Sequence, residues 1–242
     1  MNITVIVQAR FGSTRLPGKV MRQLGDRSVL SHVIDRCHAF DKVTQVVVAT
    51  TNQPTDDMIQ EESLKKGVFC YRGSEEDVLS RYYETAQLCK SDVIVRITSD
   101  CPLIDPWVSS QVINHYLSDP EIDYCSNVLK RCFPRGLDTE VFSLQALENA
   151  YRNAKEALER EHVTPYIIRN PQRFRLSAYV LPIDCSKYRW TLDTEEDWEL
   201  IKLIYERLYR RGTFFSWENT LDLMTKHPEL PAINAHIEQK NR

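Results

Sequence analysis

The feature that most constrains this chain is an apolar run that passes directly into a cationic loop. Residues 3–7 predict a buried strand, and residues 8–19 form a loop in which two glycines permit positive φ angles and close backbone approach. The cations of the loop are Arg10, Arg15 and Lys19. Backbone N–H groups and positive charge at the end of a strand suit a polyanion such as a triphosphate. The alternative is a basic surface loop that follows an edge strand.

Strand and helix signals alternate over the first 120 residues. Apolar runs predict strands at residues 46–51, 68–71 and 92–98. Helices are predicted to begin after Ser28, after a capping pair of Ser74 and Asp77, and at Pro106 after Asp105. A further helix is predicted at residues 56–66, where Gly67 ends it. Near-continuous apolar strands that alternate with helices indicate an α/β fold with a doubly wound, mostly parallel sheet.

The rhythm changes from about residue 123. Strands are predicted at residues 124–126, 139–142 and 175–180, around a mostly helical stretch at residues 144–169. Thr194 is expected to cap a helix that runs through Leu208, and a short helix from Ser216 precedes a polar tail. We therefore expect one domain over residues 1–242, with an insertion or dimerisation arm at about residues 123–185.

Composition excludes several classes of protein. The 242 residues carry a formal net charge of −3, which argues against a general nucleic-acid binder. No apolar stretch approaches the roughly 20 residues of a membrane span, and the first residues lack the pattern of a signal peptide. The seven cysteines include no C-x-x-C pair, so neither a zinc site nor a disulfide framework is indicated. A cytoplasmic protein without nucleic-acid or membrane partners is expected.

Polar side chains gather at four predicted strand ends. In open α/β sheets ligands bind beyond the carboxyl ends of the strands. Here those ends are residues 8–19, 50–51, 72–74 and 99–102. The glycine spacing of the first loop matches neither G-x-G-x-x-G nor a P-loop, and its three cations suit several phosphates.

Two carboxylates lie at positions where they could hold a metal against phosphate oxygens. Asp100 follows the predicted strand at residues 92–98, and Asp193 lies at a predicted strand-to-helix junction. Asp100 could instead bond its own backbone in a turn, and Asp193 could be an ordinary helix lead-in, with Thr194 the better cap.

The chain resembles the CMP-sugar synthetases, the cytidylyltransferases that activate acidic sugars, and most closely their spore coat polysaccharide biosynthesis branch. The segments that carry the resemblance are residues 8–19, 72–82, 96–106, 123–127, 136–142, 159–166 and 192–197. The resemblance implies a nucleotide-diphospho-sugar transferase fold of the glycosyltransferase-A, Rossmann-like type. It also implies Mg²⁺ dependence, CTP and a small sugar as substrates, and a homodimer.

The resemblance also implies roles for individual residues. The catalytic set is Arg10, Arg15, Lys19, Asp100 and Asp193, of which the two aspartates bind Mg²⁺. The nucleotide-binding set is Gln8, Ala9, Arg10, Gly12, Ser13, Lys19, Thr50, Arg72, Gly73, Ser74 and Thr98, with Thr50 and Ser74 in loops at the base.

The sugar side is assigned to polar residues of the later motifs, namely Arg135, Asp138, Glu140, Glu161 and His162. His162 could bind a substrate carboxylate or hydroxyl, or could equally lie at a subunit contact. The charged run at residues 159–161 could be a solvated helix face.

The reaction expected from these residues is transfer of CMP from CTP to an acidic or polysaccharide-precursor sugar, with release of pyrophosphate. One rival is a glycosyltransferase that uses a sugar nucleotide, although residues 99–101 (Ser-Asp-Cys) lack the Asp-x-Asp motif of such enzymes. The other rival is a non-catalytic nucleotide-binding subunit.

Overall fold

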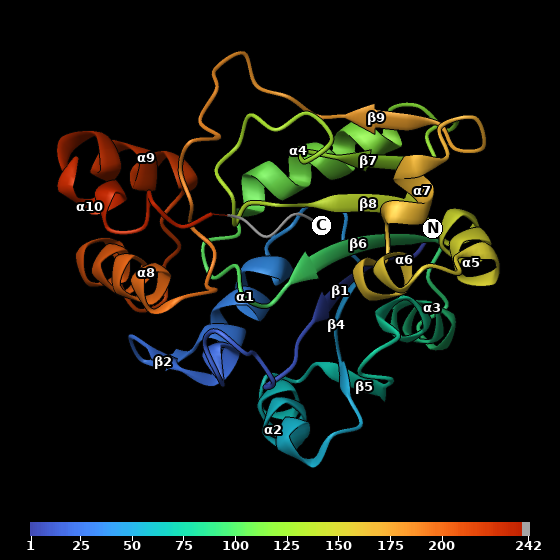
Figure 1. Cartoon of the computed structure of the whole chain (residues 1–242), viewed down its shortest axis with the longest axis horizontal. Coiled ribbons are helices and arrows are strands. Elements are labelled where there is room, and N and C mark those ends of the chain that lie inside the picture. The colour runs from blue at the N-terminus through green and yellow to red at the C-terminus, as the bar shows by residue number, and fades with distance from the viewer. Residues whose placement is uncertain (239–242) are drawn as a thin grey trace.

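A seven-stranded sheet runs through the structure, a computed structural model in which residues 1–238 are described (Figure 1). The strands are β1 (Ile3–Gln8), β4 (Gln45–Thr51), β5 (Phe69–Gly73), β6 (Val93–Thr98), β7 (Tyr124–Ser126), β8 (Glu140–Ser143) and β9 (Leu176–Ala178). Their order is β5-β4-β1-β6-β8-β7-β9, and the first four are parallel. The predicted doubly wound, mostly parallel sheet is confirmed, with β8 antiparallel to both neighbours.

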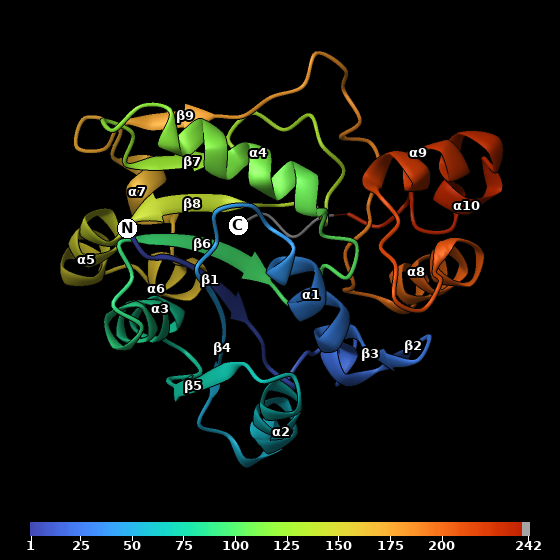
Figure 2. The ribbon, with the colours of Figure 1, turned by 180° about the vertical axis from the view of Figure 1, so that it is seen from behind.

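Helices cover both faces of the sheet, as Figures 1 and 2 show from opposite sides. One face carries α1 (Val29–His38), α2 (Asp57–Lys65) and α4 (Pro106–Leu117). The other carries α3 (Val78–Leu88), α5 (Leu144–Asn153), α6 (Ala157–His162) and α7 (Pro165–Arg169). Side chains alternate along β1, so Val5 and Val7 pack under α1 while Ile6 packs under α3. Neighbouring residues of one strand thus serve two separate cores.

Helix caps explain where most helices begin. Ser28, Asp105 and Thr194 each accept a hydrogen bond from the backbone N–H three residues on, as predicted. The predicted Ser74 cap is wrong. Asp77 is the N-cap of α3, and the Ser74 hydroxyl instead accepts from the Asp77 N–H in the preceding turn.

The second half of the chain completes the same sheet. The predicted helical stretch divides into α5, α6 and α7, and β9 is shorter than the predicted strand. Beyond the sheet lie α8 (Glu195–Leu208), α9 (Trp217–Lys226) and α10 (Glu229–Ala232), around a third apolar core that contains Trp190. Part of the predicted polar tail is therefore helical, and its last residues, 239–242, lie outside the described residues.

Short elements complete the chain: a hairpin of β2 (Gln23–Leu24) and β3 (Arg27–Ser28), and the 3-10 turns η1 (Lys19–Met21) and η2 (Pro54–Asp56). Within residues 1–238, no helix combines the length and apolar character needed to cross a membrane.

A buried histidine links the stability of the fold to pH. His32 of α1 is 4% exposed, its Nε2 donates to the Leu24 carbonyl at 2.7 Å, and its ring packs edge-on against Tyr205 and Tyr209. Burial lowers the pKa of His32 to about 4. In the unfolded chain the same side chain titrates at about 6.5.

We expect the folded state to lose up to about 3 kcal/mol of stability through His32 as the pH falls from about 6.5 to 4, because only the unfolded chain takes up the proton in that range. Urea unfolding at pH 7 and pH 4.5 measures the loss. H32Q should make it smaller, whereas H38Q, at an exposed position of the same helix, should leave it unchanged. Equal pH dependence in H32Q and the parent would contradict the role of His32.

Candidate active site

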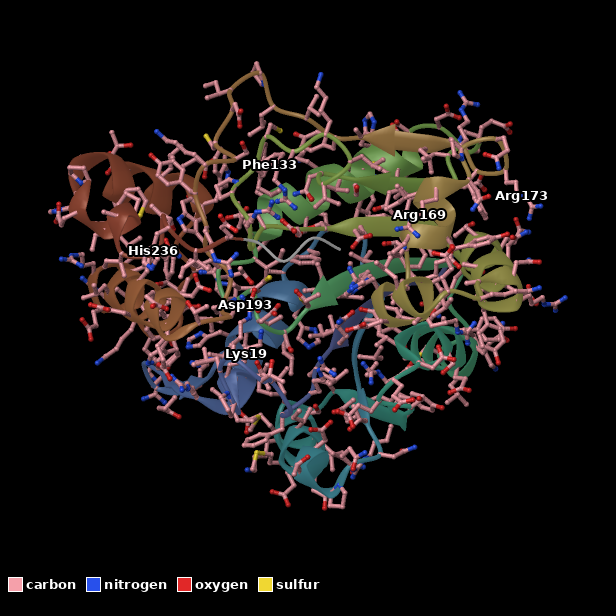
Figure 3. The ribbon with its side chains drawn as sticks, viewed as in Figure 1. Lys19, Phe133, Arg169, Arg173, Asp193 and His236 are labelled. Atoms are coloured by element: carbon pink, nitrogen blue, oxygen red, sulfur yellow. The ribbon has the colours of Figure 1, made fainter. Side chains whose placement is uncertain are left out.

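A lysine joins two aspartates at the carboxyl edge of the sheet. The Lys19 Nζ lies 2.7 Å from Asp100 Oδ2 and 2.9 Å from Asp193 Oδ1, and it donates to the Leu192 carbonyl at 2.6 Å. Figure 3 shows Lys19 and Asp193 side by side. All three charged side chains are largely buried. The opening loop, the end of β6 and the segment before α8 therefore meet at one ammonium group.

The loop reaches this point because its backbone is held at both ends. Gly18 has a φ of 65°, and a Cβ added there would lie 2.8 Å from the Phe11 ring. The Phe11 N–H donates to Asp56 Oδ1 at 2.7 Å. Asp56 also accepts from the hydroxyls of Thr50 and Thr51. The end of β4 thus anchors the start of the loop through one buried carboxylate.

Asp193 is held by a network behind it. Arg189 donates to Asp193 Oδ2 at 2.9 Å and to both oxygens of Asp197. Asp197 also accepts from the Asp193 N–H and from Asn234 Nδ2, which lies far along the chain. Within residues 1–238 no strand ends directly before Asp193, so the predicted strand-to-helix junction is wrong: the backbone there makes an isolated β-bridge between Arg189 and Arg135.

The charged groups of the cluster shift one another's pKa values. Burial acts to lower the pKa of Lys19, but Asp100 and Asp193 outweigh it and the pKa is raised. Burial and the charge of Asp100 act to raise the pKa of Asp193, but Lys19 and Arg15 outweigh them and the pKa is lowered. The lysine is therefore charged and both carboxylates lie in reach of it.

Two adjoining pockets open on either side of this cluster. The first, which we call the loop pocket, has a volume of about 400 Å³ and is lined by residues of the opening loop together with Val78, Arg81 and Glu161. The second pocket has a volume of about 380 Å³ and is lined by the second half of the chain, including Arg131 and Arg169. The residues that line both are Arg96, Thr98, Asp100, His162 and Asp193.

Most of the predicted nucleotide-binding residues line the loop pocket. They are Gln8, Ala9, Arg10, Gly12, Ser13, Lys19 and Thr98, and Arg15 of the predicted catalytic set lines the same pocket. Arg15 contacts Asp193 at 3.2 Å, whereas Arg10 lies 3.9 Å from Glu75 at the other end of the loop.

Four predicted nucleotide-binding residues line neither pocket. Thr50 is buried and donates to Asp56, and the Arg72 guanidinium is bound by Asp57 and by backbone carbonyls. Gly73 packs against Arg81, and Ser74 bonds within its own turn. In the structure these residues contact the segments around the loop and α3, and their role in nucleotide binding stays a prediction.

The predicted sugar-side residues divide between the pockets. Arg135, Asp138, Glu140 and His162 line the second pocket, whereas Glu161 lines only the loop pocket. Asp138 is held by a bidentate pair with Arg131, at 2.8 Å for each oxygen.

A buried ion pair forms the floor between the pockets. Arg96 of β6 pairs with Glu140 of β8, and Glu140 also accepts from Tyr124 at 2.8 Å and from Thr164 at 2.6 Å. Sequence reasoning placed Arg96 in a strand but did not make it a site residue. A charged residue within an otherwise apolar strand was the signal that could have found it.

A strained turn presents His162 to both pockets. Val163 follows α6 with φ 73° and ψ −56°, and the Thr164 N–H donates to the His162 carbonyl at 2.9 Å. This is a γ-turn with positive φ, a conformation that costs a β-branched residue energy. Burial of Val163 and the Thr164–Glu140 hydrogen bond hold it in place. Such strain is characteristic of functional sites.

The cluster offers a metal few protein ligands. Among residues 1–238 no group of three or more His, Cys, Asp or Glu side chains could hold an ion. Asp100 and Asp193 nevertheless converge on one cation, the Lys19 ammonium. Two carboxylates completed by water and substrate phosphates are a usual setting for Mg²⁺, so the donor set fits that ion.

A cationic loop that faces two carboxylates at the edge of a mostly parallel sheet is typical of nucleotidyltransferases. The comparison with known families gives the particular one: the cytidylyltransferase family model matches residues 4–215, and the chain belongs to this family.

Individual relatives agree. The Bacillus subtilis spore coat polysaccharide biosynthesis protein SpsF is 35% identical, over 94% of this chain and 96% of that protein. A 3-deoxy-manno-octulosonate cytidylyltransferase of Pelobacter propionicus is 34% identical over 50% of this chain and 47% of that protein. The solved structure of a cytidylyltransferase from Leptospira borgpetersenii is 34% identical and superposes over 100% of both chains with a TM-score of 0.91.

Removal of the lysine should leave two carboxylates without their shared cation. We expect K19M to lose roughly 2 kcal/mol of stability at pH 7.5. The pKa of the aspartate pair then rises above the unfolded value, so the loss should shrink as the pH falls to 5 and the folded state takes up a proton.

Urea unfolding of K19M and the parent at both pH values measures this. K226M, which removes an exposed lysine paired with Asp222, should change stability by less than about 0.5 kcal/mol at either pH. A K19M deficit that is the same at pH 5 and pH 7.5 would contradict the electrostatic account.

Proposed function

We propose that this chain transfers CMP from CTP to a small acidic sugar or polysaccharide precursor and releases pyrophosphate. The observation that carries the proposal is the placement of Lys19, Asp100 and Asp193 where two pockets adjoin. A two-substrate transfer needs a separate place for each reactant and a charged group where they meet.

The loop pocket suits the nucleotide. Its cations Arg10, Arg15 and Lys19 follow one another along a single loop, as a chain of phosphates requires. The second pocket suits a polyhydroxylated, acidic partner, because it is lined by Arg131, Arg135, Asp138 and Arg169 with groups that both donate and accept hydrogen bonds. The activities named for relatives support the same pairing of CTP with a sugar.

In the proposed reaction a sugar oxygen attacks the α-phosphorus of CTP and loses its proton to solvent water. The bond from the α-phosphorus to the bridging oxygen breaks, and pyrophosphate leaves with that oxygen. The protein contributes position and charge. Lys19 and Arg15 stabilise the charge that develops on the leaving pyrophosphate.

Mg²⁺ is the metal that we propose for Asp100 and Asp193. When bound, it would polarise the α-phosphate and offset the charge of the phosphate oxygens. Lys19 pairs with both carboxylates, and a phosphate would offer the ammonium group an alternative partner. A homodimer and a cytoplasmic location stay predictions. Light scattering of the protein in solution would test the homodimer.

Pyrophosphate release tests the proposal. The protein is incubated with each nucleoside triphosphate, Mg²⁺ and a panel of acidic sugars. Release that requires both CTP and one sugar supports it. Transfer from a ready-made sugar nucleotide would indicate a glycosyltransferase instead, and binding without turnover would indicate a non-catalytic subunit.

The paired carboxylates should be needed for turnover but not for folding. We expect D100N to lower the rate of pyrophosphate release about 100-fold, equivalent to about 3 kcal/mol of barrier. Lys19 retains Asp193 in this variant, so the thermal midpoint should change little. D222N, which alters an exposed carboxylate on α9, serves as the control and should keep the parent rate. An unchanged rate in D100N would rule out the assigned role.

A further inference from the structure

The ammonium group of Lys19 directs all its hydrogen bonds to the site itself. A lysine ammonium group has three hydrogens to donate. Here they go to Asp100 Oδ2 at 2.7 Å, to Asp193 Oδ1 at 2.9 Å and to the Leu192 carbonyl at 2.6 Å. The lysine therefore holds the same two carboxylates that the proposed function assigns to Mg²⁺, and it can bind a phosphate only by giving up one of these contacts.

A metal ion and this ammonium group cannot share the two carboxylates. Mg²⁺ binds carboxylate oxygens at about 2.1 Å. The Lys19 nitrogen stands 2.7 and 2.9 Å from those oxygens, within the space that such an ion would need. The repulsion between the two cations would also be poorly screened, because the side chains of Lys19, Asp100 and Asp193 are only 11%, 19% and 13% exposed.

The charges around the carboxylates are already balanced. Arg15 lies 3.2 Å from Asp193 Oδ2, so two side-chain cations, Arg15 and Lys19, face the two carboxylates. Behind them the charge of Arg189 is matched by that of Asp197. A divalent cation that approaches these groups therefore meets no net negative charge to attract it.

The carboxylates are held in place by contacts that do not involve the lysine. Arg189 donates to Asp193 Oδ2 at 2.9 Å, and Asp197 accepts from the Asp193 N–H at 2.9 Å. The backbone of Asp100 is fixed as well, since its carbonyl accepts from the Leu192 N–H at 2.8 Å. The lysine side chain can therefore leave while the two segments that carry the aspartates stay together.

The lysine side chain has a second place to go. Lys19 lines the loop pocket, where the proposed function places the triphosphate. Its backbone lies in η1, where its N–H donates to the Leu16 carbonyl at 3.3 Å. A lysine stem is flexible, so the ammonium group can move by side-chain torsions alone. A triphosphate in the pocket would offer it oxygens that carry more negative charge than the two carboxylates do.

We propose that Lys19 is an internal counter-ion that keeps divalent cations off Asp100 and Asp193 until the phosphates of a nucleotide draw it away. The inference rests on the proposed function, since it takes a triphosphate in the loop pocket and Mg²⁺ on the two aspartates. Nucleotide and metal then bind cooperatively: each raises the affinity for the other by the same factor. The metal centre is complete only when the nucleotide is present.

Thermal unfolding and calorimetric titration with MgCl₂ alone, without nucleotide, test the exclusion. An ion that binds the folded state raises the thermal midpoint. We expect Mg²⁺ to leave the midpoint of the parent unchanged and to raise that of K19M. The affinity of K19M for Mg²⁺ should exceed that of the parent roughly 10-fold or more, because the adjacent positive charge is gone.

Two control variants locate the effect. In K19M/D100N the gain in affinity for Mg²⁺ should be lost, which places the ion on the aspartate pair. K226M removes an exposed lysine that is paired with Asp222, and it should respond to Mg²⁺ as the parent does.

Water proton relaxation by Mn²⁺, an ion that prefers the same oxygen ligands as Mg²⁺, tests the release of the lysine. In the parent, Mn²⁺ alone should stay unbound, and the addition of CTP should produce protein-bound Mn²⁺. D100N should show less bound Mn²⁺ at the same concentrations of ion and CTP, because one of the two carboxylates is lost.

Two results would overturn the proposal. One is a gain of no affinity for Mg²⁺ in K19M. The other is a parent midpoint that rises with Mg²⁺ alone and no longer rises in D100N, a result that stands even if K19M does not fold. Failure of the proposed function looks different, because the parent would then release no pyrophosphate with CTP and any sugar, whatever the titrations with metal alone show.

Discussion

The ammonium group of Lys19 holds three distant segments of this chain together at the site. Lys19 ties together residues that are 81 and 174 positions away along the chain, and it does so in a site where neither carboxylate is freely hydrated. Because each charge is costly without the others, the opening loop, the end of β6 and the start of α8 must arrive together. The pockets on either side exist because this junction holds three otherwise separate segments at fixed spacing.

The arginines of the site serve two different purposes. Arg96 and Arg189 have carboxylate partners in the interior and act as scaffold, the first between β6 and β8 and the second behind Asp193. Arg81 is as deeply buried and has no such partner among the described residues, where its guanidinium donates to the Ser74 carbonyl. The Nε atoms of both Arg81 and Arg96 lack a hydrogen-bond partner within residues 1–238. Burial alone therefore does not show whether a buried arginine has a carboxylate partner.

Local signals in the sequence were enough for much of the fold. The apolar runs of β1, β4 and β6 and the caps at Ser28 and Asp105 depend on neighbouring residues, and the structure agrees with them. The site was only partly predictable, because partners such as Arg189, Asp197 and Asn234 are chosen by tertiary packing. The position of Thr50 in a motif did not show that its hydroxyl donates to Asp56, or that Thr50 lies outside the lining of both pockets.

The contact of Asn234 with Asp197 has an evolutionary consequence. The part of the chain that matches the family model ends at residue 215, yet a residue 19 positions later steadies the carboxylate network behind Asp193. The segment that follows α10 thus lies beyond the part matched by the family model, and it contacts the network that supports Asp193. A substitution at Asn234 would remove a hydrogen bond to Asp197 and so change the surroundings of Asp193, while every side chain that lines the pockets stays the same. Relatives with identical pocket residues need not be interchangeable catalysts.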